Sequence, residues 1–186
     1  MNIPPFDPAH ALRFDLNRGT IKLADETSRV VLPVDALLGL WRAAGDEEKR
    51  DFGRSLGTEI GRLVVERLGN GVMNAAVPEV VDHVAGELAL LGLGNLAVEI
   101  WGRALCLTVS DSPLGQEGDA LLAAIMEGVA QRALSRSIAV VAISREDDTV
   151  RLLATSAAGA RKAEQWLEAG HSYGDVLGFL NRGTSP

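Results

Sequence analysis

The chain has 186 residues, which is enough for one compact domain that needs neither a disulfide nor a metal to support its core. Its 18 basic and 25 acidic residues give a net charge of −7, which argues against binding to a nucleic-acid backbone, because proteins that do so concentrate basic residues on one surface. Aromatic residues make up only 4% of a chain that is 47% hydrophobic, so we expect an aliphatic core.

The sequence carries no sign of export or of a membrane span. Met1 to Phe14 lack the basic start and apolar run of a secretory signal, and no apolar stretch approaches the roughly 20 residues that a span requires. Cys106 is the single cysteine, so no intramolecular disulfide can form. We therefore expect a cytoplasmic protein.

The N-terminal region predicts a hairpin followed by a helix. Leu12 to Leu16 and Thr20 to Ala24 flank Asn17-Arg18-Gly19, a spacing typical of a β-hairpin. Ser28 to Val34 predicts a third short strand, and a helix follows from Asp35 to Gly45.

Two further helices are expected before the middle of the chain. Asp46 is a suitable N-cap for a helix that runs to about Leu68, where Gly69-Asn70-Gly71 ends it. The segment from Gly71 to Val77 predicts a loop, and Pro78 begins another helix.

The second half alternates apolar hairpins with helices. We expect strands at Leu96 to Trp101, Ala104 to Val109, Ile138 to Ile143 and Val150 to Ala154, and helices at Asp119 to Leu134, Ala158 to Ala169 and Asp175 to Leu180. Strands joined in hairpins predict an α+β fold, in which an antiparallel sheet of about four strands has helices on one face. The chain is then a single domain, 1–186, with a lead and hairpin (1–34), a core (35–155) and an added C-terminal helical element (156–186).

Residues suited to catalysis are scarce. His10 lies in the proline-rich lead and His171 in a predicted loop after Gly170, without partners that the sequence can place. Cys106 lies between Leu105 and Leu107 in a predicted strand, which favours an inert core thiol over a reactive one. Gly92-Leu93-Gly94 precedes a strand instead of a helix, so it is not a phosphate-binding loop. We expect no enzyme activity and no cofactor.

Glu79, His83 and Glu87 are spaced by four residues and share one side of a predicted helix. Such a trio could contribute to a divalent metal site, but one helix rarely supplies a complete ligand set. The pattern favours a solvated polar edge, and we expect no structural metal.

Gly53, Gly57 and Gly61 form the most specific local pattern, at four-residue spacing along one helix. Each glycine costs a helix about 1 kcal/mol relative to alanine, so the stripe indicates close approach of another backbone. That element could be an internal helix, a partner subunit or an apolar ligand.

The order of these elements resembles the 4-vinyl reductase domain, a small-molecule-binding family related to the TRAPP tethering subunits and to haem-based nitric-oxide sensors. The resemblance covers about Leu37 to Thr155 and includes the glycine-studded helix, the Gly-Leu-Gly step, Ser112-Pro113 and the mid-helix Gly128. Two features depart from it. The cysteines that many members carry are missing from Leu121 to Thr155, and no Tyr-x-Ser-x-Arg haem motif is present.

The resemblance implies a domain that dimerises and can enclose an apolar pocket between helices and sheet. We expect a ligand-binding or regulatory domain whose aliphatic pocket binds a small apolar molecule. A protein-interaction adaptor without a ligand is an equal alternative, and an enzyme is a distant third.

Overall fold

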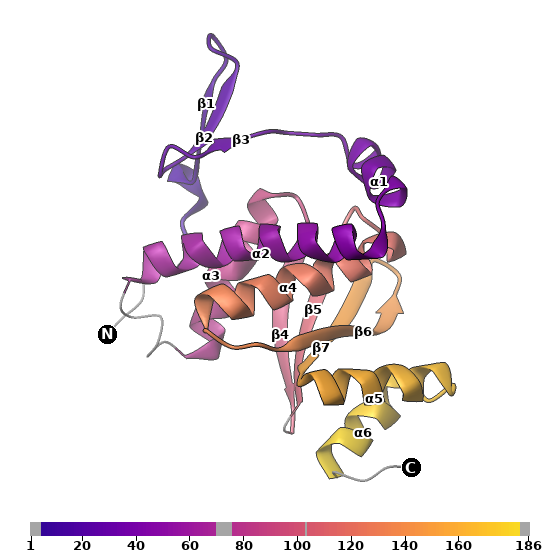
Figure 1. Cartoon of the computed structure of the whole chain (residues 1–186). Coiled ribbons are helices and arrows are strands. Elements are labelled where there is room, and N and C mark those ends of the chain that lie inside the picture. Colours follow the sequence, from indigo (N-terminus) through magenta and orange to yellow (C-terminus); the bar gives the residue numbers. More distant parts are fainter. Residues whose placement is uncertain (1–4, 70–75, 103, 183–186) are drawn as a thin grey trace.

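The fold is α+β, as the sequence predicted. A computed structural model describes residues 5–69, 76–102 and 104–182, and its elements are coloured along the chain in Figure 1. The strands are β1 (Leu12–Asp15), β2 (Thr20–Leu23), β3 (Ser28–Arg29), β4 (Asn95–Trp101), β5 (Ala104–Ser110), β6 (Ala139–Glu146) and β7 (Thr149–Thr155). The α-helices are α1 (Val34–Ala43), α2 (Asp46–Leu68), α3 (Val77–Leu90), α4 (Asp119–Ala133), α5 (Ala157–Glu168) and α6 (Tyr173–Arg182).

The central sheet has four antiparallel strands in the order β4-β5-β7-β6. β4 and β5 form the predicted apolar hairpin, in register from Asn95 opposite Ser110 to Trp101 opposite Ala104. β7 lies between β5 and β6, so the two hairpins join into one sheet. A second, three-stranded sheet, β1-β2-β3, contains the predicted N-terminal hairpin.

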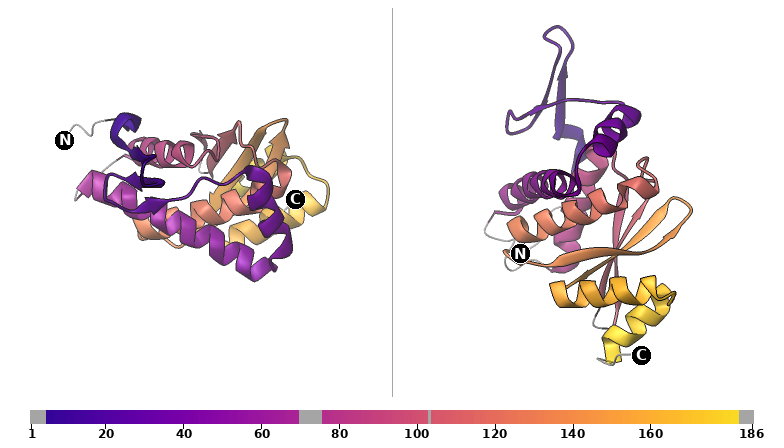
Figure 2. Two further views of the ribbon diagram at one scale, coloured as in Figure 1. Left: turned by 90° about the horizontal axis from the view of Figure 1, so that it is seen from above. Right: turned by 45° about the vertical axis from the view of Figure 1, so that its right-hand side comes forward.

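Helices cover both faces of the central sheet, and the expectation that they cover one face is wrong. α2, α3 and α4 lie on one side, while α5 and α6 lie on the other (Figure 2). β5 alternates accordingly: Leu107 and Val109 enter the larger core, and Cys106 enters the smaller one beneath α5 and α6. The C-terminal helices supply Ala163, Val176 and other apolar residues, which bury a sheet face that would otherwise meet water.

Two local boundaries also differ from the sequence predictions. Gly45, and not Asp46, is the N-cap of α2, with extended backbone and no side-chain capping bond. The third strand is only Ser28–Arg29, which pairs with Lys22 and Ile21 of β2. The residues that follow, up to Pro33, form an extended linker to α1.

Asn70 to Ala75, which include most of the predicted loop, and Arg103 lie outside the described residues.

α2 packs along α4 at the three glycines of the predicted stripe. A Cβ built at Gly53 would lie 2.6 Å from Cβ of Ala124, and one built at Gly57 would overlap the backbone carbonyl of Ile125. Gly128 returns the contact from α4, where a Cβ would overlap the backbone of Arg54. The approaching element is thus an internal helix, and the two backbones come closer than any side chain at these positions would permit.

We predict that Gly57→Ala lowers the free energy of unfolding by about 1–3 kcal/mol, because the methyl group meets backbone that cannot move aside cheaply. Gly39→Ala is the matched control, since Gly39 is a mid-helix glycine of α1 with no atom within 4 Å of its Cβ position. The control should gain up to about 1 kcal/mol from helix propensity. Chemical denaturation of both variants measures the two changes, and a stabilised Gly57→Ala protein would contradict the packing argument.

Candidate functional site

An apolar cavity of about 90 Å³, partly open to solvent, lies between α3, α4 and the central sheet. Every lining residue is aliphatic or methionine, and the set is Val77, Val80, Val81, Val84, Leu96, Leu105, Leu107, Met126, Val129, Ala130, Leu134, Ile138 and Ala154. No charged or hydrogen-bonding side chain belongs to this lining, so the cavity offers burial and no polar anchor.

The lining follows from the periodicity of the elements around it. Valines at helical spacing turn one face of α3 toward the sheet, and alternation in β5 places Leu105 and Leu107 on the same side. Met126 enters from α4, and its flexible thioether side chain can adjust to irregular space. The cavity is smaller than the roughly 150 Å³ of an apolar cavity known to take up benzene, so a ring would require modest side-chain movement.

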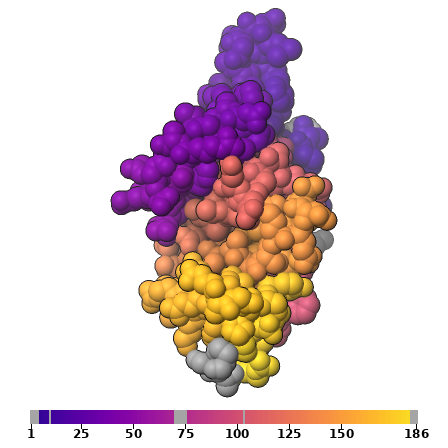
Figure 3. Space-filling model, turned by 90° about the vertical axis from the view of Figure 1, so that its right-hand side faces the viewer, coloured from indigo at the N-terminus to yellow at the C-terminus, as the bar shows by residue number. Residues whose placement is uncertain are grey.

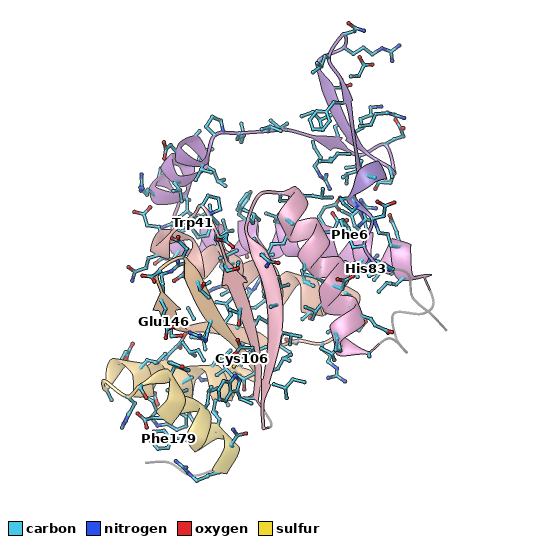
Figure 4. The ribbon with its side chains drawn as sticks, turned by 180° about the vertical axis from the view of Figure 1, so that it is seen from behind. Phe6, Trp41, His83, Cys106, Glu146 and Phe179 are labelled. Carbon is cyan, nitrogen blue, oxygen red and sulfur yellow. The ribbon has the colours of Figure 1, made fainter. Side chains whose placement is uncertain are left out.

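The other side of α3 holds the polar trio, and the expectation of a solvated edge is wrong. His83 and Glu87 are only 4% and 3% exposed. The N-terminal segment folds back over them: the ring of Phe6 meets the His83 imidazole edge-on at 6.2 Å and lies directly on Gly86 (Figure 4). This contact is possible because Gly86 has no Cβ, which would overlap the ring.

Arg67 of α2 completes the cluster. Its guanidinium lies 2.5 Å from a Glu87 carboxylate oxygen and 4.6 Å from the centre of the Phe6 ring. Burial raises the pKa of Glu87 above its ordinary value, although the positive charge of Arg67 opposes the shift. The cluster thus joins α2, α3 and the N-terminal segment around one buried carboxyl group.

The structure does not bring the trio together as a metal site. Glu79 turns away to accept a hydrogen bond from the backbone N–H of Ala76 at 2.9 Å, at the start of α3. Across the described ranges, no three His, Cys, Asp or Glu side chains converge in a way that could hold a metal ion. Cys106 is fully buried, as expected, and burial raises its pKa to about 11, so the thiol stays protonated near neutral pH.

We predict that Glu87→Gln changes the pH dependence of stability. Because the folded state raises the pKa of Glu87, its contribution is complete at acid pH and is lost as pH rises through the folded-state pKa. Glutamine stays neutral, so the variant should lose less stability than the wild type as the pH rises above the ordinary carboxyl range, from about pH 4 upward. Denaturation curves across this range measure the difference.

Glu26→Gln serves as a control of opposite sign. Hydrogen bonds from Lys22 and Arg13 lower the pKa of Glu26, so the stability that it contributes is lost as pH falls. The free energy of unfolding of this variant should therefore fall less at acid pH than that of the wild type. The loss of stability at higher pH, which we assign to Glu87, should remain. An unaltered slope in Glu87→Gln would refute the assignment.

The sequence predicted the apolar valine face of α3 and the apolar strands, but it did not predict which of these residues line a cavity. Apolar periodicity marks a buried face, and a tightly packed valine gives the same signal as a valine beside empty space. The contacts of Phe6 with His83 and of Arg67 with Glu87 were also missed, because no local pattern links residues so distant in the chain.

No protein-family model and no curated protein sequence matches the chain. Among solved structures, its fold is similar to that of the phenol-responsive sensory domain of the transcription activator PoxR, solved with phenol. The TM-score is 0.63 at 15% sequence identity, and the match covers 86% of this chain and 92% of that one. None of the helices in the described part of the chain is long and apolar enough to cross a membrane. At this identity the likeness is one of fold, shared along nearly the whole length with a sensory domain.

Proposed function

We propose that the chain is a non-catalytic, regulatory ligand-binding domain that takes a small uncharged molecule into the cavity between α3, α4 and the sheet. The observation that carries the proposal is the entirely apolar lining of this cavity. The fold supports it, because a similar architecture serves a phenol-responsive sensory domain. A cytoplasmic location, kinship with 4-vinyl reductase domains and a homodimeric state belong to the same proposal.

The lining defines the ligand class by its chemistry. A buried apolar surface contributes about 25 cal/mol per Å², so an apolar molecule gains affinity simply by leaving water. A charged ligand would lose its hydration without finding any partner among the lining residues, which costs several kcal/mol. We therefore expect small, neutral, largely apolar molecules, with at most one weakly polar group.

We predict that phenol and toluene stabilise the protein against thermal unfolding and that benzoate does not. At a free ligand concentration one hundred times Kd, binding adds about 2.7 kcal/mol to the free energy of unfolding. Titration of the full chain, followed by differential scanning calorimetry and calorimetric binding measurements, tests this expectation.

Ala130→Leu should abolish the effect, because the larger side chain fills the cavity from α4. Ala120→Leu is the matched control: it makes the same change on the same helix at an exposed position outside the lining. Equal stabilisation of both variants by toluene would place binding elsewhere, and no stabilisation of the wild type by either ring would reject the ligand-binding proposal.

A protein-interaction adaptor is the second candidate function. It is favoured by the distribution of exposed apolar residues, since 7 of the 11 large ones found among the described residues fall between Phe14 and Phe52. The two functions are separable, because a protein that binds no small ring could still use this surface.

A further inference from the structure

Residues 6–11 cross the outer side of α3 on their way to the β1–β2 hairpin, and we call this segment the N-terminal strap. Two contacts attach it to α3: the backbone N–H of Phe6 donates to a carboxylate oxygen of Asp82 at 3.2 Å, and the ring of Phe6 lies on Gly86. A third contact comes from α2, where the guanidinium of Arg67 lies 4.6 Å from the centre of the same ring. One aromatic side chain thus fastens the strap to two helices.

The strap and the proposed ligand cavity lie on opposite sides of α3. Val80 and Val84 face the sheet and line the cavity. Asp82 and Gly86, which hold Phe6, lie roughly half a turn around the helix from these valines. The helix is therefore held between the cavity and the strap, and an outward movement of α3 must displace Phe6.

α3 is the wall of the cavity that can move most readily. Hydrogen bonds hold β5 and β7 in register, and α4 is fixed by the backbone contact of Gly57 and Gly128 with α2. α3 has its glycine at the strap instead, and it meets the cavity through valine side chains, which can shift. The cavity of about 90 Å³ is smaller than the roughly 150 Å³ that accommodates benzene. Entry of a ring should therefore push α3 outward, against the strap.

We propose that the N-terminal strap restrains ligand binding by holding α3 against the sheet, and that a ligand in the cavity releases Phe6 from Gly86. This inference rests on the proposed ligand-binding function and assigns its regulation. The coupling is reciprocal: release of the strap raises ligand affinity by the same factor by which the ligand favours release. The strap continues into the hairpin, which projects above the body of the molecule (Figure 3), so binding inside the fold alters the attachment of an exposed element.

The affinity for toluene of two strap variants tests the restraint. Phe6→Ala removes the ring, and Gly86→Ala displaces it, because the added Cβ would overlap the ring. Neither residue lines the cavity. Titration calorimetry of the full chain should show that each variant binds toluene at least about fivefold more tightly than the wild type, the lower end of typical coupling between sites. The double variant should gain no more than either single one, because both changes remove the same contact.

Phe14→Ala and Gly39→Ala are the matched controls. Phe14 lies in the hairpin and is 58% exposed, and no atom lies within 4 Å of the Cβ position of Gly39 in α1. Both controls should bind toluene with the affinity of the wild type. Thermal unfolding establishes that each variant is folded, and Gly86→Ala decides the question if Phe6→Ala does not fold.

Hydrogen exchange followed by mass spectrometry tests the release. In the wild type, toluene should speed the exchange of backbone amides in the strap while slowing exchange in β5 and β7. If the strap only stabilised the fold, a bound ligand would slow its exchange together with that of the sheet. In Phe6→Ala, exchange in the strap should be fast without toluene and unchanged by it.

Equal or lower toluene affinity in the folded strap variants overturns the proposal, and so does slower exchange of the strap when toluene binds the wild type. In both cases binding by the wild type leaves the ligand-binding function standing. If toluene binds neither the wild type nor the strap variants, the ligand-binding function fails, and the proposed regulation fails with it.

Discussion

The close contact between α2 and α4 is the constraint on which the rest of the structure depends. α4 packs directly on the central sheet, and α2 makes its most extensive contact by lying along α4 at Gly53, Gly57 and Gly61. Arg62 of α2 holds the base of the N-terminal hairpin, whereas α1 is fixed at Glu117, just before α4, by a hydrogen bond from the indole N–H of Trp41 and an ion pair with Arg42. Separating α2 from α4 by one methyl group would therefore displace α2 and the hairpin base that Arg62 holds.

The two sides of α3 make different contacts. Its valine side lines the cavity against the sheet, and the opposite side carries His83 and Glu87 beneath Phe6. A buried carboxyl group costs stability, and the ion pair with Arg67 offsets part of that cost while fixing α3 to α2. A movement of α3 that enlarged the cavity would disturb this cluster, so the helix physically connects the proposed ligand cavity with the N-terminal segment.

The sequence by itself determined the elements of the central fold, because periodicity and turn residues are local signals. The hairpins, the helix that ends near Leu68 and the close approach at the glycine stripe all follow from them. Only the tertiary structure decided that helices cover both sheet faces and that Val30 to Leu32 stay exposed beyond a shortened strand. It also decided that His83 and Glu87 are buried, since the side chains that cover them come from Phe6 and from another helix. Burial depends on which distant segments meet, and no local pattern of residues encodes that meeting.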